Sequence, residues 1–127
     1  MLRMINEIVG WISLALVPIS GAVLGLGFHR ADYLGGYDAY PRRLLRLGHI
    51  SFFGLGVLNI LFAFSAERMN LGPLHFASAS YAMIIGNISM PIACFVNAWR
   101  PNFKPLFVIP VASVMHGTIT AAYGVAR

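Results

Sequence analysis

The fold of this 127-residue chain is decided by one stretch, RLGHISFFGLGVLNILFAFSAE, which occupies residues 46–67. Between Arg46 and Glu67 there are 20 residues without a formal charge. A helix needs about 20 apolar residues to cross the hydrocarbon core of a bilayer, at about 1.5 Å per residue. The stretch therefore predicts a membrane-spanning helix. His49 and Asn59 lie within it, and we expect both to face protein or a cavity because polar side chains are costly in lipid.

Composition extends this prediction to the whole chain. Hydrophobic residues make up 58% of it and charged residues only 10%, whereas a soluble domain usually carries about 25% charged residues. A soluble core of this size cannot bury so much apolar surface. The length suits one domain, so we expect a single transmembrane domain over residues 1–127.

Three further runs lack formal charges, at residues 8–29, 69–99 and 105–126. Each is long enough to span a bilayer, and none resembles the alternating strands of about 10 residues in a membrane β-barrel. The sequence therefore predicts an all-α, up-down bundle of four transmembrane helices. Their approximate bounds are 6–28, 42–66, 75–99 and 105–125.

Basic residues are distributed unevenly between the two ends of this bundle. Six of the nine Lys and Arg residues belong to the first and third loops, and three belong to the opposite side. The positive-inside rule then places loops 1 and 3 in the cytoplasm and both termini outside. The short loops and small size suit a bacterial inner membrane. The basic residues do not cluster on one element, which argues against a nucleic-acid partner.

Polar and small residues recur every seven positions in each predicted helix, the spacing at which packed membrane helices meet. We call these sets the heptad stripes and expect them to face inward. They are Gly10, Ser13, Val17, Ser20, Leu24 and Gly27; His49, Phe52, Gly56, Asn59 and Ala63; Ser80, Met83, Asn87 and Cys94; and Ser113, His116, Thr120 and Tyr123.

Counting residues from the centre of each span places Asn59, Asn87 and His116 within about 4 Å of the midplane. They come from three helices and could converge. One interpretation is that they only make hydrogen bonds between helices. The other is a substrate, proton or cofactor site at the midplane.

His49 lies nearer the first loop and is a candidate axial ligand of haem b. Gly56 is on the same stripe and would leave room for a flat macrocycle, while Arg42, Arg43 and Arg46 are close enough in sequence to pair with haem propionates. The alternative is a histidine near the interface that bonds to a backbone carbonyl or a lipid headgroup.

A metal site is a further possibility for the same layer. The depth count places Cys94 level with His49, and His29 about one turn further out. Histidine and cysteine are metal ligands, but their spacing here matches no diagnostic pattern.

Missing features narrow the choice of function. No Asp, Glu, Lys or Arg lies within a predicted span, which argues against a proton-coupled transporter. No hydrolase, P-loop or haem-attachment motif occurs, which favours a protein that is not an enzyme on its own. The leading hypothesis is a redox-associated membrane subunit that binds haem b or quinone through the layer of His49, or an accessory subunit of a respiratory complex.

Two alternatives belong to other classes. The first is a small oligomeric channel or carrier with the midplane site of Asn59, Asn87 and His116. The second is a structural or assembly subunit without a cofactor, which binds other membrane subunits or its own copies through small-residue faces such as Gly21-xxx-Gly25. The lipid bilayer is a partner in every case.

Overall fold

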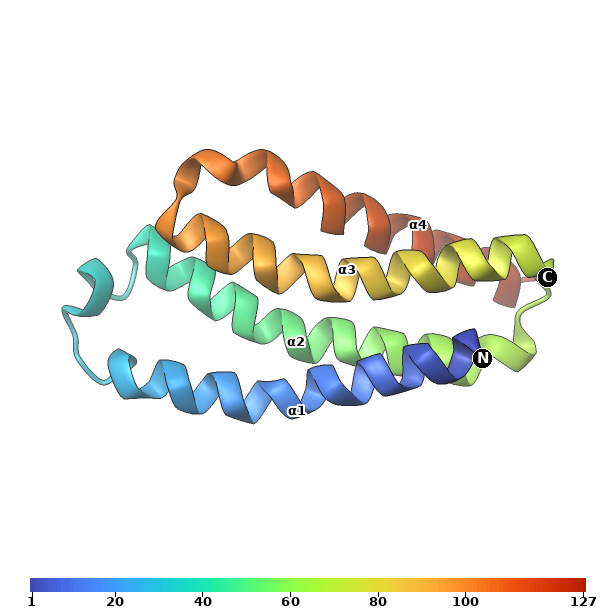
Figure 1. The fold of residues 1–127 in the computed structure, drawn as a ribbon, viewed down its shortest axis with the longest axis horizontal. Coiled ribbons are helices and arrows are strands. Elements are labelled where there is room, and N and C mark those ends of the chain that lie inside the picture. Colours follow the sequence, from blue (N-terminus) through green and yellow to red (C-terminus); the bar gives the residue numbers. More distant parts are fainter.

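The computed structural model describes all residues from Met1 to Arg127 and contains only helices, turns and short connections (Figure 1). Four α-helices form an up-down bundle, with both termini at the same end. Their bounds are Leu2–Phe28 (α1), Tyr40–Ser65 (α2), Pro73–Trp99 (α3) and Val108–Val125 (α4), and 3-10 segments occupy Tyr33–Gly35 (η1), Ala66–Arg68 (η2) and Pro101–Phe107 (η3).

The four predicted spans are confirmed as helices that are long and apolar enough to cross a membrane. The fourth differs in detail, because η3 precedes α4 and belongs to the same apolar segment. Local sequence explains the boundaries. Pro41 and Pro73 lie in the first turns of α2 and α3, where the missing N–H costs nothing. Arg100 leaves the helical conformation immediately before Pro101, which disfavours helix at the preceding residue.

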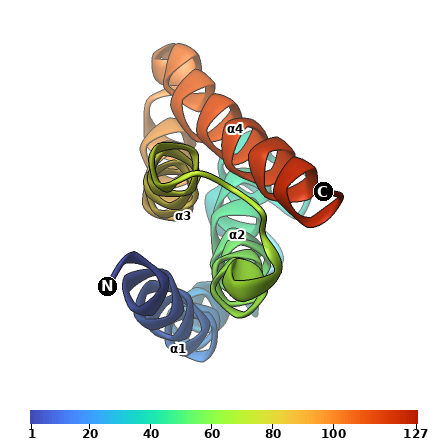
Figure 2. The same cartoon turned by 90° about the vertical axis from the view of Figure 1, so that its right-hand side faces the viewer.

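The helices are not equivalent in burial. In the most apolar windows of α2 and α3, 44% and 50% of residues are buried, against 11% in α1 and 11% in α4. Figure 2 shows the reason: α2 and α3 form a central pair, while α1 and α4 lie on opposite sides of it. Most of the surface of α1 and α4 therefore presents apolar side chains outward, as helices that contact lipid do.

The contact between α1 and α2 depends on two glycines that bring the backbones close together. A Cβ atom added to Gly56 would lie 3.0 Å from the carbonyl oxygen of Gly10, and one added to Gly10 would lie 2.8 Å from the carbonyl oxygen of Gly56. Small residues permit such close approach in membranes, where packing drives helix association. The pair therefore holds the two helices in direct contact in the half of the bundle nearer the termini.

The heptad stripes are confirmed for the first three helices. Their buried members include Gly10 and Ser13 in α1, Gly56, Asn59 and Ala63 in α2, and Ser80, Met83, Asn87 and Cys94 in α3.

The stripe predicted for the fourth helix is wrong. His116 and Tyr123 are exposed, and the buried residues of α4 are Pro110, Gly117 and Gly124. These three also repeat every seven positions. The side chains of Met83 and Leu71 occupy the space beside Gly117 and Gly124, so close packing determined which face turned inward.

Candidate functional site

The three residues predicted to meet at the midplane lie in three different helix contacts. Asn59 donates to the carbonyl oxygen of Met83 at 3.2 Å, between α2 and α3. Asn87 and Ser13 are 3.0 Å apart, between α1 and α3. The ring Nε2 of His116 lies 3.2 Å from the hydroxyl of Ser78, between α4 and α3. No shared polar site is formed by these residues.

An offset between α3 and α4 explains why His116 is not near Asn87. The end of α4 is fixed at the amino end of α3, where the N–H of Asn70 donates to the carbonyl oxygen of Gly124 at 2.9 Å. His116 therefore lies at the level of Ser78. Ser78 and Asn87 are nine residues apart on α3, or about 13 Å along the axis. Residue counts within single helices could not reveal this shift.

The surroundings of His49 do not fit a haem. Its Nδ1 lies 2.8 Å from the hydroxyl of Ser20, and its ring fills the space beside Gly21. Gly56, which was expected to leave room for the macrocycle, is buried against the backbone of α1. The α1–α2 contact thus occupies the volume that a haem on this stripe would need.

The arginines near His49 are also engaged elsewhere. Arg42 is only 5% exposed, and its guanidinium donates to the carbonyl oxygens of Phe28, Arg30 and Ala31 at the carboxyl end of α1. It therefore supplies the hydrogen bonds that the last turn of a helix lacks. Its Nε is buried without a partner.

Arg43 and Arg46 remain on the surface of the first turns of α2. The Nη1 of Arg46 donates to the carbonyl oxygen of Tyr37 at 2.9 Å. Arg43 is exposed and forms no ion pair. These two side chains lie at the end of the bundle that carries loops 1 and 3 and do not converge on His49.

The candidate metal ligands are not brought together either. Cys94 is fully buried against Gly48 in the α2–α3 contact, whereas His49 faces α1 and His29 is exposed at the end of α1. No group of three or more His, Cys, Asp or Glu side chains in this chain is arranged to hold a metal ion.

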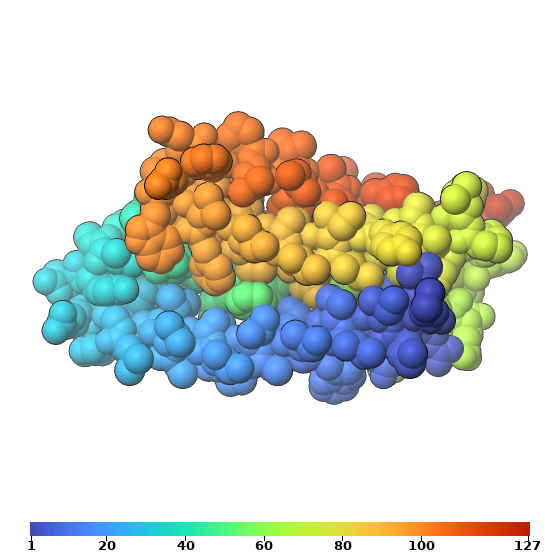
Figure 3. All heavy atoms as spheres, viewed as in Figure 1, coloured from blue at the N-terminus to red at the C-terminus, as the bar shows by residue number.

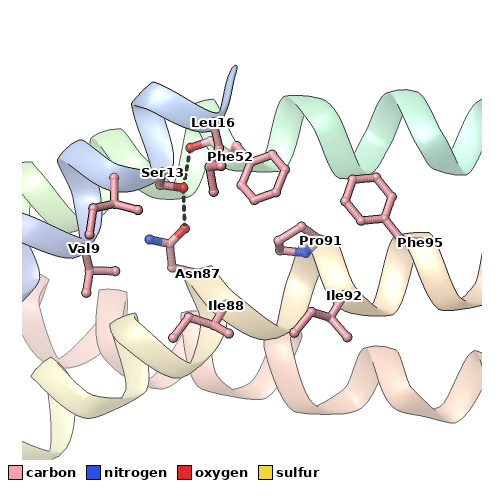
Figure 4. A pocket seen from close by; sticks show the side chains of 10 residues that line it. Val9, Ser13, Leu16, Phe52, Asn87, Ile88, Pro91, Ile92 and Phe95 are labelled. Carbon is pink, nitrogen blue, oxygen red and sulfur yellow. Dashed lines mark hydrogen bonds between the residues drawn. The ribbon is translucent and has the colours of Figure 1, made fainter. Parts of the chain in front are cut away.

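The structure instead shows an apolar groove between α1 and α3, with a volume of about 400 Å³ (Figure 4). We call it the α1–α3 groove. This volume falls within the range of small-molecule sites, about 300–1,000 Å³. Phe52 of α2 contributes to its wall, and the groove is open at the molecular surface between α1 and α3 (Figure 3). The groove is lined by Val9, Ile12, Ser13, Leu16, Phe52, Asn87, Ile88, Pro91, Ile92 and Phe95.

Two polar side chains, Ser13 and Asn87, are the exception in this apolar lining (Figure 4). The Ser13 hydroxyl lies 2.9 Å from the carbonyl oxygen of Phe52 and 3.0 Å from Oδ1 of Asn87. Asn87 is 3% exposed, and its Nδ2 makes no hydrogen bond within the protein. This nitrogen does not belong to the fully buried polar atoms without a partner, so it stays accessible to a ligand in the groove.

The Asn87 amide can face the groove in two ways. A hydroxyl has one proton, so Ser13 donates fully either to Phe52 or to Asn87. If Asn87 turns its amide over, Nδ2 donates to the Ser13 oxygen, Ser13 donates to Phe52, and Oδ1 is left free. In one orientation Asn87 therefore presents its Nδ2 donor to the groove, and in the other it presents its Oδ1 acceptor.

Pro91 adds a second polar feature next to this amide. It lies four residues after Asn87 inside α3 and has no N–H, so it cannot give the Asn87 carbonyl oxygen its usual helical hydrogen bond. Asn87 was predicted from the sequence as a site residue, but the groove beside it was not. An asparagine four residues before a proline in the same span was the available signal.

Comparison with protein-family models, curated proteins and solved structures gives no match for this chain.

Proposed function

We propose that this protein is a small membrane subunit that binds a quinone in the α1–α3 groove. The observation that carries the proposal is the Asn87 side chain, whose Nδ2 has no hydrogen-bond partner in the protein and lines an otherwise apolar groove of about 400 Å³. Ligand sites typically combine an apolar lining with a few placed polar groups. A quinone matches this pattern, because it joins a ring with carbonyl groups to an apolar tail.

The two orientations of the Asn87 amide suit both oxidation states of such a ligand. A quinone carbonyl accepts a hydrogen bond and would take the Nδ2 donor. A quinol hydroxyl donates one and would take the Oδ1 acceptor. Ser13 remains hydrogen-bonded in both cases, since it can exchange its proton between Phe52 and Asn87. The remaining lining, such as Ile88 and Ile92, would contact the tail at the opening toward lipid.

The proposed setting is a bacterial inner membrane, with loops 1 and 3 on the cytoplasmic side. The end of the bundle with loops 1 and 3 carries six basic side chains and two carboxylates. The end with the termini carries three basic side chains and two carboxylates. The chain contains no Asp, Glu, Lys or Arg in the middle of its helices. The electrons that reduce a bound quinone would come from a redox-active partner subunit, which this proposal includes.

Ligand binding in nanodiscs tests the proposal. Trp11 lies on α1 next to the groove residue Ile12, so quenching of its fluorescence by decyl-ubiquinone provides a signal in a Trp99→Phe background. Specific binding should saturate, whereas partition into lipid should give a linear response. Asn87→Leu should weaken binding about 5–10-fold, the worth of roughly one hydrogen bond.

A second pair of variants separates the groove from the lipid surface. Val9→Phe fills the groove and should abolish saturation. Val23→Phe makes the same change on α1 at a side chain that is 63% exposed and should bind normally. Linear quenching by the unmodified protein would refute the proposal. Equal saturable binding of a plain alkyl chain would show that the groove holds acyl chains instead.

A second candidate function, that of an assembly subunit, is favoured by the polar pair of His116 and Ser78. Both residues are exposed on the surface of α3 and α4, inside segments that can span the membrane. Polar side chains at such positions normally face protein. Cross-linking from a cysteine at position 116 to another polypeptide in native membranes would support it, and exclusive labelling by lipid probes would refute it.

A further inference from the structure

A second groove, of about 600 Å³, lies on the outer surface of the first three turns of α2. We call it the α2 groove. It is lined by Tyr40, Arg43, Leu44, Arg46, Leu47 and Ile50 and shares no residue with the α1–α3 groove. Its polar lining residues, Tyr40, Arg43 and Arg46, lie in its outer half, and only the aliphatic residues Leu47 and Ile50 line its inner half. The eleven residues from Tyr40 to Ile50 correspond to a rise of about 15 Å along the helix, half the thickness of a bilayer core.

The cations beside the α2 groove have no carboxylate partners. The one ion pair of the chain joins Arg3 to Glu67 at the opposite end of the bundle. Arg43 is exposed and unpaired, and Lys104 of η3 approaches the same place, with its Nζ 5.8 Å from the centre of the Tyr40 ring. Positive charge from two elements thus meets at the outer half of the groove.

Arg46 is held in position before any ligand arrives. Its Nη1 donates to the carbonyl oxygen of Tyr37 at 2.9 Å, and its guanidinium carbon lies 4.1 Å from the centre of the Tyr37 ring. Arginine has five N–H donors, so this contact leaves others for an anion. A guanidinium that is already ordered loses less freedom when it binds a phosphate.

We propose that the α2 groove binds an anionic phospholipid of the leaflet next to loops 1 and 3. Its phosphate contacts Arg43, Arg46 and Lys104, and an acyl chain lies along Leu47 and Ile50. Basic pockets at this depth of a membrane protein suit anionic headgroups. Phosphate chemistry alone would also fit a free anion, but the aliphatic inner half gives a free anion no contact. This inference does not depend on the proposed quinone site.

The test uses native mass spectrometry of the full chain after reconstitution with equal amounts of phosphatidylglycerol and phosphatidylcholine. The unmodified protein should retain phosphatidylglycerol selectively. Arg43→Gln combined with Lys104→Gln should reduce that retention about tenfold or more. The matched control is Arg30→Gln combined with Arg100→Gln, which removes the same charge from exposed positions at the same end and should retain the lipid.

Two outcomes would overturn the proposal. If both double variants lose the lipid equally, net charge and not the α2 groove attracts it. If millimolar inorganic phosphate displaces the lipid completely, or Leu47→Asn leaves retention unchanged, the acyl chain plays no part and the site binds free anions. Circular dichroism and thermal melting in neutral detergent show whether each variant is folded, so that lost binding is not mistaken for lost structure.

Discussion

Replacing Gly56 with alanine should weaken the contact between α1 and α2. The added Cβ would lie 3.0 Å from the carbonyl oxygen of Gly10 and 3.1 Å from the Cβ of Ser13, whereas ordinary contacts begin at about 3.4 Å. Helix α1 must then move away from α2 by a few tenths of an ångström. The nearest atom is a backbone oxygen, which cannot swing aside as the end of a flexible side chain could. Overpacking of this kind typically costs about 1–3 kcal/mol.

Gly54→Ala is the matched control for this change. It lies two residues away on the same helix, and a Cβ at Gly54 would meet nothing within 4 Å. Both substitutions remove a helix-interior glycine, which favours the helix by about 0.5–1 kcal/mol in water. This local gain cancels when the two variants are compared. We therefore expect Gly56→Ala to have a free energy of unfolding about 1–3 kcal/mol below that of Gly54→Ala.

Unfolding in mixed micelles with increasing sodium dodecyl sulfate, followed by circular dichroism, measures this difference. If the free energies of unfolding of the two variants agree within about 0.5 kcal/mol, the close α1–α2 contact is refuted. A difference that small is no larger than the usual scatter between mutations at independent sites. The comparison of Gly56→Ala with Gly54→Ala also tests whether Gly56 lines a haem site. If Gly56 lined a haem cavity, alanine would impair cofactor binding and leave the stability of the protein alone unchanged.

Two further predictions concern the ends and the outer surface of the bundle. Arg42→Gln should lower the free energy of unfolding by about 2–3 kcal/mol, because its guanidinium serves three carbonyl oxygens at the end of α1. Arg43→Gln, which removes no hydrogen bond, should change it by less than about 0.5 kcal/mol in neutral detergent, and equal losses would contradict the capping role. His116→Leu should cost less than about 1 kcal/mol in the same assay, because it removes only the bond to Ser78; a loss of several kcal/mol would mean that His116 belongs to a larger network.

The spans were predictable because crossing a membrane depends on properties of one segment at a time. Four charge-free runs predicted four helices, and each was found within a few residues of its expected bounds, apart from the 3-10 start of the fourth. The faces of α1, α2 and α3 were also predictable. Residues such as Ser13, Asn59 and Asn87 are costly in lipid, so they mark the inward side of their helices.

The face of α4 was not predictable by the same rule. That helix has two heptad stripes, one polar, with Ser113, His116 and Thr120, and one of small residues, with Gly117 and Gly124. Glycine allowed α3 to approach closely, and this packing turned the small-residue stripe inward, while His116 keeps a single hydrogen bond with Ser78 at the surface. The choice between the two stripes depends on neighbouring residues that fill the space beside the glycines, Met83 in α3 and Leu71 in the connection before it.

Sequence alone thus determined that the chain has four helices long and apolar enough to span a membrane, and where they begin and end to within a few residues. It also determined which end of the bundle carries more positive charge. Tertiary structure decided which polar residues meet. It separated Asn59, Asn87 and His116 into three helix contacts, filled the expected haem space with α1, and left a groove beside Asn87. The physical reason is that hydropathy belongs to single residues, whereas a site requires the rotation and offset of neighbouring helices, which close packing sets.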